Sequence, residues 1–252
     1  MTNPHEVIIR PYAPRDRDAV RHLCCETADR GEPLERFFGD REAFADLVTG
    51  YYTDHEPQSV WVAEHAGQVI GYLTGCLDTR RHSRILATRV VPTALLRAVY
   101  RGTLLSAQTW RLLWAGILTW GHGVLHMASA DARQRPPQNM ASPPRTLAEP
   151  VAGGFGGHVS LKDYPAHFHV DIQRGFRRQQ VGRRLVERFF EHAHAAGIRG
   201  IHIAVRADNP SSRRFFERMG FTELARCSVT FPQGASYEVH DTIVYGKRLP
   251  SR

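Results

Sequence analysis

One stretch of this chain couples a strand of alternating side chains to a helix through a turn of arginine and amide side chains. Residues 166–172 alternate polar and apolar side chains, which predicts a β-strand. Residues 173–180 are rich in arginine and glutamine, and residues 180–196 have the apolar spacing of a helix. Such a unit can bind an anion, because the first backbone N–H groups of a helix have no partner within it.

The turn at residues 177–182 reads Arg-Arg-Gln-Gln-Val-Gly. It would offer free N–H groups and the positive end of the helix dipole to a pyrophosphate. Gly182 has no side chain and would let phosphates approach the backbone closely. The alternative interpretation is an ordinary arginine-rich helix N-terminus on a solvated surface.

A second segment, residues 209–221, reads as a capped helix followed by a strand. Asn209 suits the N-cap and Gly220 the end of the helix. Together the two segments resemble the acyl-CoA-binding half of the GCN5-related N-acetyltransferase (GNAT) superfamily. The turn of that superfamily follows the pattern Arg/Gln-x-x-Gly-x-Gly/Ala, and its later helix begins near a cofactor-binding Asn and ends in Gly-Phe.

The resemblance implies a mixed α/β (α+β) fold with a mostly antiparallel central sheet flanked by helices. The fourth and fifth strands should be parallel and should splay to admit the pantetheine arm of acetyl-CoA, the implied cosubstrate. The residues that the resemblance assigns to cosubstrate binding are Ile172, Gln173, Arg177, Arg178, Gln179, Gln180, Val181, Gly182, Arg183, Asn209 and Phe216.

Two positions depart from the superfamily pattern. Gln180 replaces the first glycine of the turn. Right-handed helical dihedrals at Gln180 would be tolerable, whereas a positive φ would impair the site. Phe216 stands where the family carries a tyrosine that often protonates the leaving thiolate. Because phenylalanine has no ionisable proton, another group is the acid, or solvent or backbone assists the thiolate, or the protein is no catalyst.

The strand before the turn carries titratable side chains on one face. Strand alternation places His167, His169 and Asp171 together, which predicts that they line a cleft. We expect Asp171 to be the general base, assisted by His169. There are two alternatives: a metal site of two histidines and one aspartate, and a polar face whose groups satisfy one another. No metal is expected, because same-face residues are ~6.5–7 Å apart along a strand.

Residues 164–171 are also similar to a narrower subgroup, the acetyltransferase-like region of O-GlcNAcases and related bacterial proteins. In that subgroup the aspartate of this strand is a catalytic candidate. The Pro-Glu-Tyr that usually follows the strand is Arg-Gly-Phe here, at residues 174–176. The function implied is N-acetyl transfer to a primary amine of a small molecule or peptide, by direct attack in a ternary complex. The alternative is a non-catalytic acyl-CoA-binding or interaction module.

The rest of the chain completes a single domain, residues 1–252, with a helical insertion and a Pro/Gly-rich loop at 83–157. The Trp-rich face of the insertion should pack against the domain or a partner subunit, which would give a homodimer; a substrate lid or a membrane-surface patch are alternatives. The other expected elements are strands at 7–12, 59–64, 68–77, 200–205, 221–229 and 242–247, and helices at 16–28, 34–52, 83–120 and 211–219.

Charge and cysteine content narrow the setting. The net charge is +8 and the pI about 9.7, but the arginines are scattered, so we expect no nucleic-acid partner. The four cysteines lack metal-ligand spacing and favour a reduced cytoplasm. No run reaches the ~18 apolar residues of a membrane span, so no integral membrane segment is expected.

Overall fold

The structure, a computed structural model, describes residues 6–28, 31–34, 40–100, 159–233 and 236–250. Within them a mixed sheet has the strand order β1-β2-β3-β4-β5-β7-β6, and every neighbouring pair is antiparallel except β4 and β5. This confirms the predicted mixed, mostly antiparallel sheet with a parallel central pair. The strands are β1 (Ile8–Pro11), β2 (Val60–His65), β3 (Gln68–Cys76), β4 (Ala166–Ile172), β5 (Gly200–Arg206), β6 (Thr222–Gln233) and β7 (Ser236–Arg248).

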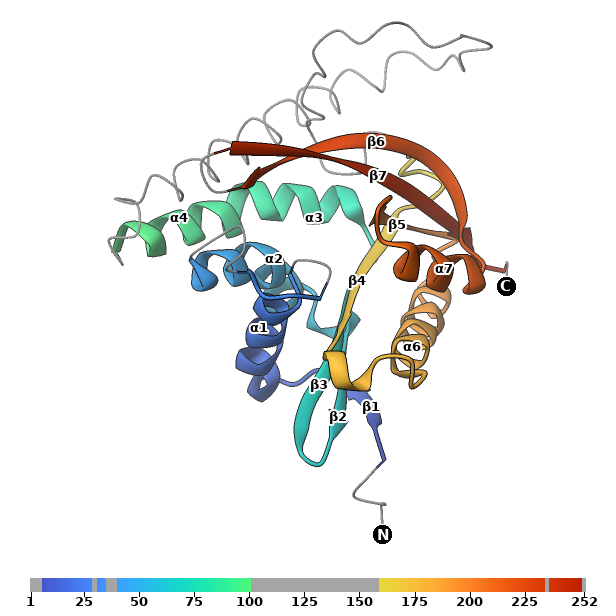
Figure 1. Ribbon diagram of the computed structural model, residues 1–252, viewed down its shortest axis with the longest axis horizontal. Coiled ribbons are helices and arrows are strands. Elements are labelled where there is room, and N and C mark those ends of the chain that lie inside the picture. Colours follow the sequence, from blue (N-terminus) through green and yellow to red (C-terminus); the bar gives the residue numbers. More distant parts are fainter. Residues whose placement is uncertain (1–5, 29–30, 35–39, 101–158, 234–235, 251–252) are drawn as a thin grey trace, which may run out of the picture.

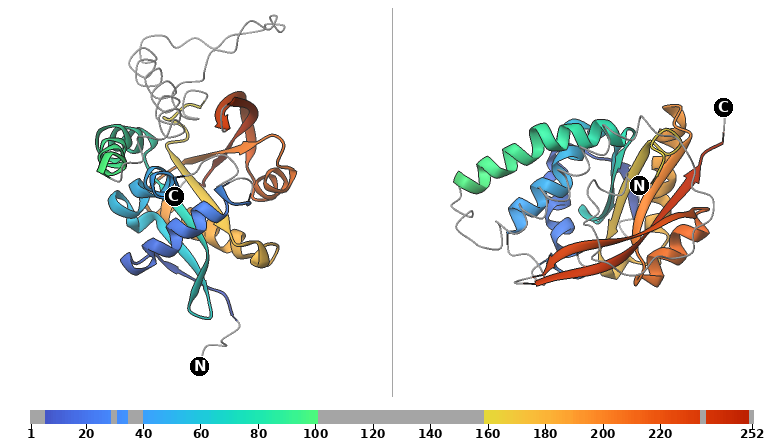
Figure 2. Two further views of the ribbon diagram at one scale, coloured as in Figure 1. Left: turned by 60° about the vertical axis from the view of Figure 1, so that its left-hand side comes forward. Right: turned by 90° about the horizontal axis from the view of Figure 1, so that it is seen from above.

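Helices cover both faces of the sheet (Figures 1 and 2). On one face, α1 and α2 pack on a cluster that includes Tyr72 of β3; on the other, α6 packs on a cluster that includes Leu73. These neighbours point to opposite faces because side chains alternate along a strand. The helices are α1 (Arg17–Glu26), α2 (Arg41–His55), α3 (Thr79–Ile85), α4 (Val91–Tyr100), α6 (Val181–Ala195) and α7 (Pro210–Arg218).

The strands predicted at 59–64 and 68–77 are confirmed and form an antiparallel hairpin, with left-handed φ angles of 48° at Ala66 and 77° at Gly67 in its turn. The predicted strands at 221–229 and 242–247 are too short. The observed β6–β7 ladder continues to the pair Gln233–Ser236. β6 continues through Pro232 because it is an edge strand, where proline is tolerated since one side of the backbone has no neighbour to bond.

The start of the predicted insertion is one long helical run rather than a helix beginning at residue 83. α3 begins at Thr79, where the side chain of Asp78 accepts hydrogen bonds from two backbone N–H groups of the first turn. A π-helical turn, Leu86–Val90, joins α3 to α4. Pro92, the second residue of α4, has no N–H to continue the α-helical ladder, which accounts for the altered hydrogen bonding. The remainder of the insertion, 101–157, with its tryptophans, lies outside the described residues.

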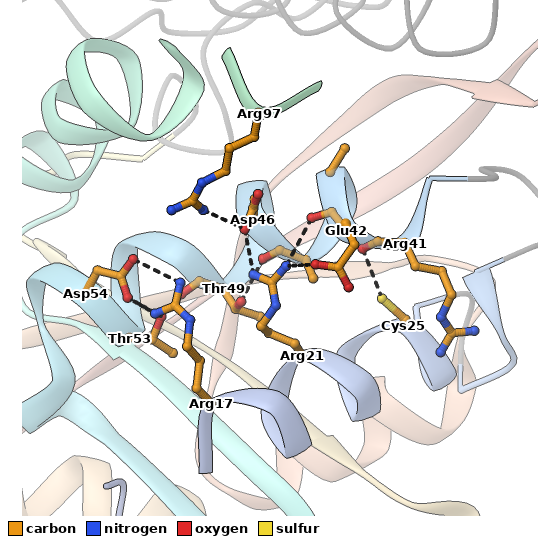
Figure 3. Close-up of polar contacts among 12 residues, drawn as sticks. Arg17, Arg21, Cys25, Arg41, Glu42, Asp46, Thr49, Thr53, Asp54 and Arg97 are labelled. Atoms are coloured by element: carbon orange, nitrogen blue, oxygen red, sulfur yellow. Dashed lines mark hydrogen bonds and ion pairs between the residues drawn. The ribbon is translucent and has the colours of Figure 1, made fainter. Parts of the chain in front are cut away.

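A buried carboxylate ties α4 to the helices of the domain (Figure 3). Asp46 of α2, with a 6 % exposed side chain, accepts from Arg21 of α1 at 2.7 Å and from Arg97 of α4 at 3.1 Å. Glu42 also pairs with Arg21, at 2.7 Å. One acidic position therefore holds three helices in register at the base of the insertion.

Candidate functional site

β4 and β5 open a gap in the middle of the sheet. In the described structure they pair only at Ala166–Ile201 and His167–His202, whereas β5 pairs with β7 along its whole length. The last residues of β4 therefore lose their neighbour on one side while they remain paired with β3 on the other. The predicted splay between the fourth and fifth strands is present.

The register of β3 and β4 shows which backbone groups face this gap. The N–H of Gln173 donates to the carbonyl of Ile70 at 2.9 Å, so Gln173 is directed toward β3. Hydrogen bonding alternates along an antiparallel pair, so Ile172 and Val170 direct their N–H groups to the opposite side. Of Ile172 and Gln173, both expected to bind the cosubstrate, Gln173 has its N–H bonded to β3, whereas Ile172 directs its N–H into the gap.

The start of α6 lies beside the end of β4 and carries no side-chain cap. Its first intrahelical bond runs from the N–H of Arg184 to the carbonyl of Gln180 at 3.0 Å, so the N–H groups of residues 181–183 have no partner in the helix. Gln180 has φ 65° and ψ 0°, the left-handed conformation. Gln180 therefore has the positive φ that we expected to impair the site, not right-handed helical dihedrals. The left-handed conformation costs a non-glycine residue about 1–2 kcal/mol.

Gly182 faces the protein interior rather than the loop surface. A Cβ built on it would lie 3.0 Å from Cδ1 of Ile172 and 3.6 Å from Cζ of Phe215. The glycine therefore lets α6 approach β4 and α7 closely. This packing role differs from the expected role, in which Gly182 makes room for phosphates.

Arg177 folds back onto the end of β4. Its Nε donates to the carbonyl of Ile172 at 3.1 Å, and its guanidinium lies against Gly31, where even a methyl group would collide with it. Arg177 thus closes the turn over β4 and places a positive charge near Asp171.

The other polar side chains of the turn differ in how strongly they are held. Gln179 donates to the carbonyl of Gly175 at 2.9 Å, and Arg183 pairs with Glu187 at 2.7 Å. Arg178 is exposed and has a left-handed φ of 62°. The loop therefore presents Arg178 on its surface next to the unsatisfied start of α6.

Asp171 is the half-buried carboxylate of β4. Burial raises its pKa, and the Tyr72 hydroxyl and the charge of Arg177 oppose that rise. The Tyr72 hydroxyl donates to Oδ2 of Asp171 at 2.8 Å. A carboxylate with a raised pKa binds a proton more readily, which suits a general base.

His167, on the same strand face, is held by hydrogen bonds on both ring nitrogens. The Thr79 hydroxyl donates to the carbonyl of Pro165 at 2.7 Å, so its oxygen accepts the Nδ1–H of His167, also at 2.7 Å. Nε2 then accepts from the Tyr52 hydroxyl at 2.9 Å. Burial lowers the pKa of His167 well below its usual value. It is a structural histidine, neutral and fixed in one tautomer.

Of the two histidines on this face, His169 is the exposed one. Loss of solvation at its ring, and then the nearby His202, lower its pKa to about 4, so it is neutral at pH 7 and can accept a proton. In the part of the chain that the structure describes, no three His, Cys, Asp or Glu side chains are grouped to hold a metal ion. On this face of β4, the imidazole of His169 and the carboxylate of Asp171 are therefore accessible to a ligand, whereas His167 is buried and has a structural role.

The two positions taken from the later helix lie at opposite ends of α7. Asn209 accepts from the N–H of Ser212 at 3.1 Å and is an N-cap, which leaves its amide NH2. Phe216 is 8 % exposed, with its ring 6.0 Å from that of Phe168 and 5.7 Å from that of Phe221. It supplies packing beside β4 and no proton.

Sequence reasoning missed Tyr72 and Arg177's contact with Ile172. Tyr72 sits in a predicted strand with no motif around it. Only the pairing of Tyr72 with Asp171 across β3 and β4 brings its hydroxyl to the carboxylate. Nothing local in the sequence reports that register.

Comparisons with known proteins agree with this geometry. Residues 141–221 match the acetyltransferase (GNAT) family model. The structure of SsHAT is similar at 24% identity and TM-score 0.62, over 96% of this chain and 98% of that one. YncA, a putative acetyltransferase from Salmonella typhimurium with its cofactor acetyl-CoA, is similar at 14% identity and TM-score 0.52, over 98% and 95% of the two chains.

A GCN5-related N-acetyltransferase from Kribbella flavida is similar at 16% identity and TM-score 0.51, over 98% of this chain and 100% of that one. At these identities the solved structures establish the fold, and the family model adds a sequence match over residues 141–221. None of the described helices is both long and apolar enough to cross a bilayer. The chain therefore has a GNAT-like fold, and its residues 141–221 match the acetyltransferase (GNAT) family model.

Proposed function

We propose that this protein transfers an acetyl group from acetyl-CoA to a primary amine. The observation that carries the proposal is the gap between β4 and β5, which β4 lines with the N–H groups of Val170 and Ile172. The gap lies beside the unsatisfied start of α6. An extended thioester and a pyrophosphate need these two features side by side.

In this proposal the pantetheine arm enters the gap and the thioester carbonyl accepts from the backbone N–H of Ile172. The pyrophosphate meets the N–H groups of residues 181–183 and the guanidinium of Arg178. These donors are fixed by the fold before the reaction, so they stabilise a developing oxyanion without reorganising.

The chemistry proposed needs no enzyme nucleophile. Asp171 accepts one proton from the ammonium group, and the free amine attacks the thioester carbonyl. The nitrogen of the tetrahedral intermediate loses a second proton to solvent as the C–S bond breaks, which leaves the amide. The CoA thiolate leaves and takes a proton from solvent, because Phe216 has none to give. Consistent with direct transfer, all four cysteines are buried. Their Sγ atoms are poorly placed to attack a bound thioester.

The deciding test uses Asp171→Asn, which keeps the shape of the side chain and removes the base. Release of free CoA is measured with a panel of primary amines, and acetyl-CoA affinity by calorimetry. We expect kcat to fall about 10²-fold or more with affinity unchanged. Asp163→Asn, an exposed carboxylate paired with Arg248, is the matched control and should keep wild-type kcat.

Two results would contradict the proposal. Near-wild-type kcat in Asp171→Asn would show that another group is the base. Tight acetyl-CoA binding with no CoA release for any amine would identify a non-catalytic acyl-CoA-binding module, the reading that Phe216 favours.

A further inference from the structure

Tyr72 lies directly across the sheet from the proposed base. β3 and β4 pair Tyr72 with Asp171, and the tyrosine hydroxyl donates to Oδ2 of Asp171 at 2.8 Å. The tyrosine is 1 % exposed and packs with side chains of α1, among them Leu23 and Cys24. A buried phenol needs a hydrogen-bond partner, and its strand position leaves its ring little freedom to seek another.

We infer that Tyr72 is the positioning residue of the reaction: its hydroxyl orients the Asp171 carboxylate and keeps it ionised so that it can take the proton of the acceptor amine. This inference rests on the proposed function. The bond occupies Oδ2 and fixes the rotation of the carboxylate, so the approach of the amine is defined relative to one oxygen.

The surroundings of Asp171 explain why such a partner is required. Burial alone disfavours the carboxylate and raises its pKa. Three groups oppose this: Tyr72 from β3, Thr27 just after α1 and the charge of Arg177 from the turn after β4. The thiol of Cys24 lies against the Tyr72 hydroxyl and is itself kept protonated by burial, which raises its pKa to about 12. Tyr72 is thus the buried hydrogen-bond donor that the sheet itself holds against the base.

The direction of the effect follows from which form the bond favours. A hydrogen bond to the carboxylate stabilises the charged form, so its removal lets the pKa of Asp171 rise further. A larger fraction of the enzyme would then carry a protonated, inactive base at a given pH. Binding of acetyl-CoA, which depends on the backbone of β4 and the start of α6, would not change.

The experiment compares wild type with Tyr72→Phe, and with Tyr12→Phe as the matched control. Tyr12 packs on the same cluster, but its phenol is near Arg17 rather than Asp171. We expect the carboxyl ¹³C titration of Asp171, and the acid limb of kcat/KM against pH, to move up by about one pH unit in Tyr72→Phe. Below that limb kcat/KM should fall about tenfold, and Tyr12→Phe should match wild type.

A double variant tests whether Tyr72 acts through Asp171. In an Asp171→Asn background Tyr72→Phe should cost no further kcat, since the group that it serves is gone. An unchanged Asp171 midpoint in Tyr72→Phe, or an equal loss of kcat in both backgrounds, would overturn the inference.

The titration also separates this inference from the proposed function, because it needs no turnover. A moved Asp171 midpoint in a protein that releases no CoA with any amine supports the coupling and refutes the catalysis. Should Tyr72→Phe fail to fold, wild type decides: the ring ¹³Cζ signal of Tyr72 should titrate with the same midpoint as Asp171. A flat Tyr72 signal would overturn the inference.

Discussion

Gln180 is the residue whose substitution most directly tests the geometry of the proposed phosphate loop. Its φ is 65°, and its side chain is exposed at the start of α6 with no capping bond to the helix. Glycine adopts this conformation without the Cβ clash that other residues suffer. We therefore expect Gln180→Gly to stabilise the protein, against the usual rule that glycine near a helix weakens it.

The magnitude follows from two opposing contributions. The left-handed conformation costs a non-glycine residue about 1–2 kcal/mol. Glycine gains more freedom than other residues in the unfolded chain, which costs about 0.5–1 kcal/mol. The difference favours Gln180→Gly by about 1 kcal/mol, which corresponds to a rise in Tm of about 2–4 °C for a chain of this size.

The control is the neighbouring residue. Gln179 is also exposed, but its φ is not positive, and its amide donates to the carbonyl of Gly175. Gln179→Gly should therefore lower stability by about 1 kcal/mol. Urea unfolding and thermal melts of both variants give the free energies, and calorimetry with acetyl-CoA should show binding to Gln180→Gly at least as tight as to wild type. Destabilisation of Gln180→Gly similar to that of Gln179→Gly would refute a left-handed residue at position 180.

Two further predictions concern the stability of the helices α1 to α4. Asp46→Ala removes the carboxylate shared by α1 and α4 and should lower the free energy of unfolding in urea by about 2 kcal/mol, less than for a fully buried pair because Arg97 is 52 % exposed. Asp54→Ala, whose carboxylate is 39 % exposed and pairs with Arg17, should lower it by under about 1 kcal/mol. Equal losses in the two variants would contradict the bridging role of Asp46. Burial lowers the pKa of His82 to about 3, so below pH ~6.5 the unfolded chain binds a proton that the folded chain does not. As the pH is lowered from ~6.5 toward 3, the free energy of unfolding should therefore decrease by about 1.4 kcal/mol per pH unit for this residue. His82→Phe should flatten the measured slope by that amount, and an unchanged slope would show that His82 is protonated in the folded protein.

Local sequence determined the elements that carry the site. The alternation of residues 166–172 predicted β4 with its observed bounds and placed Asp171 and His169 on one face, because side-chain direction along a strand depends only on position. The apolar spacing of 180–196 predicts α6 to within a residue at each end, and the predicted cap at Asn209 is confirmed by its bond to the N–H of Ser212. These features arise from backbone geometry within a few residues, so the sequence contains them.

Tertiary structure decided what those elements do to one another. The contact of Tyr72 with Asp171 joins residues 99 positions apart and depends on the register of β3 against β4. The inward face of Gly182 depends on how closely α6 packs on Ile172. The left-handed conformation of Gln180 is imposed on a residue with no intrinsic preference for it, because the turn must join β4 to α6 at a fixed separation. Local propensity specifies direction and periodicity, whereas register and close approach emerge only when distant segments share one core.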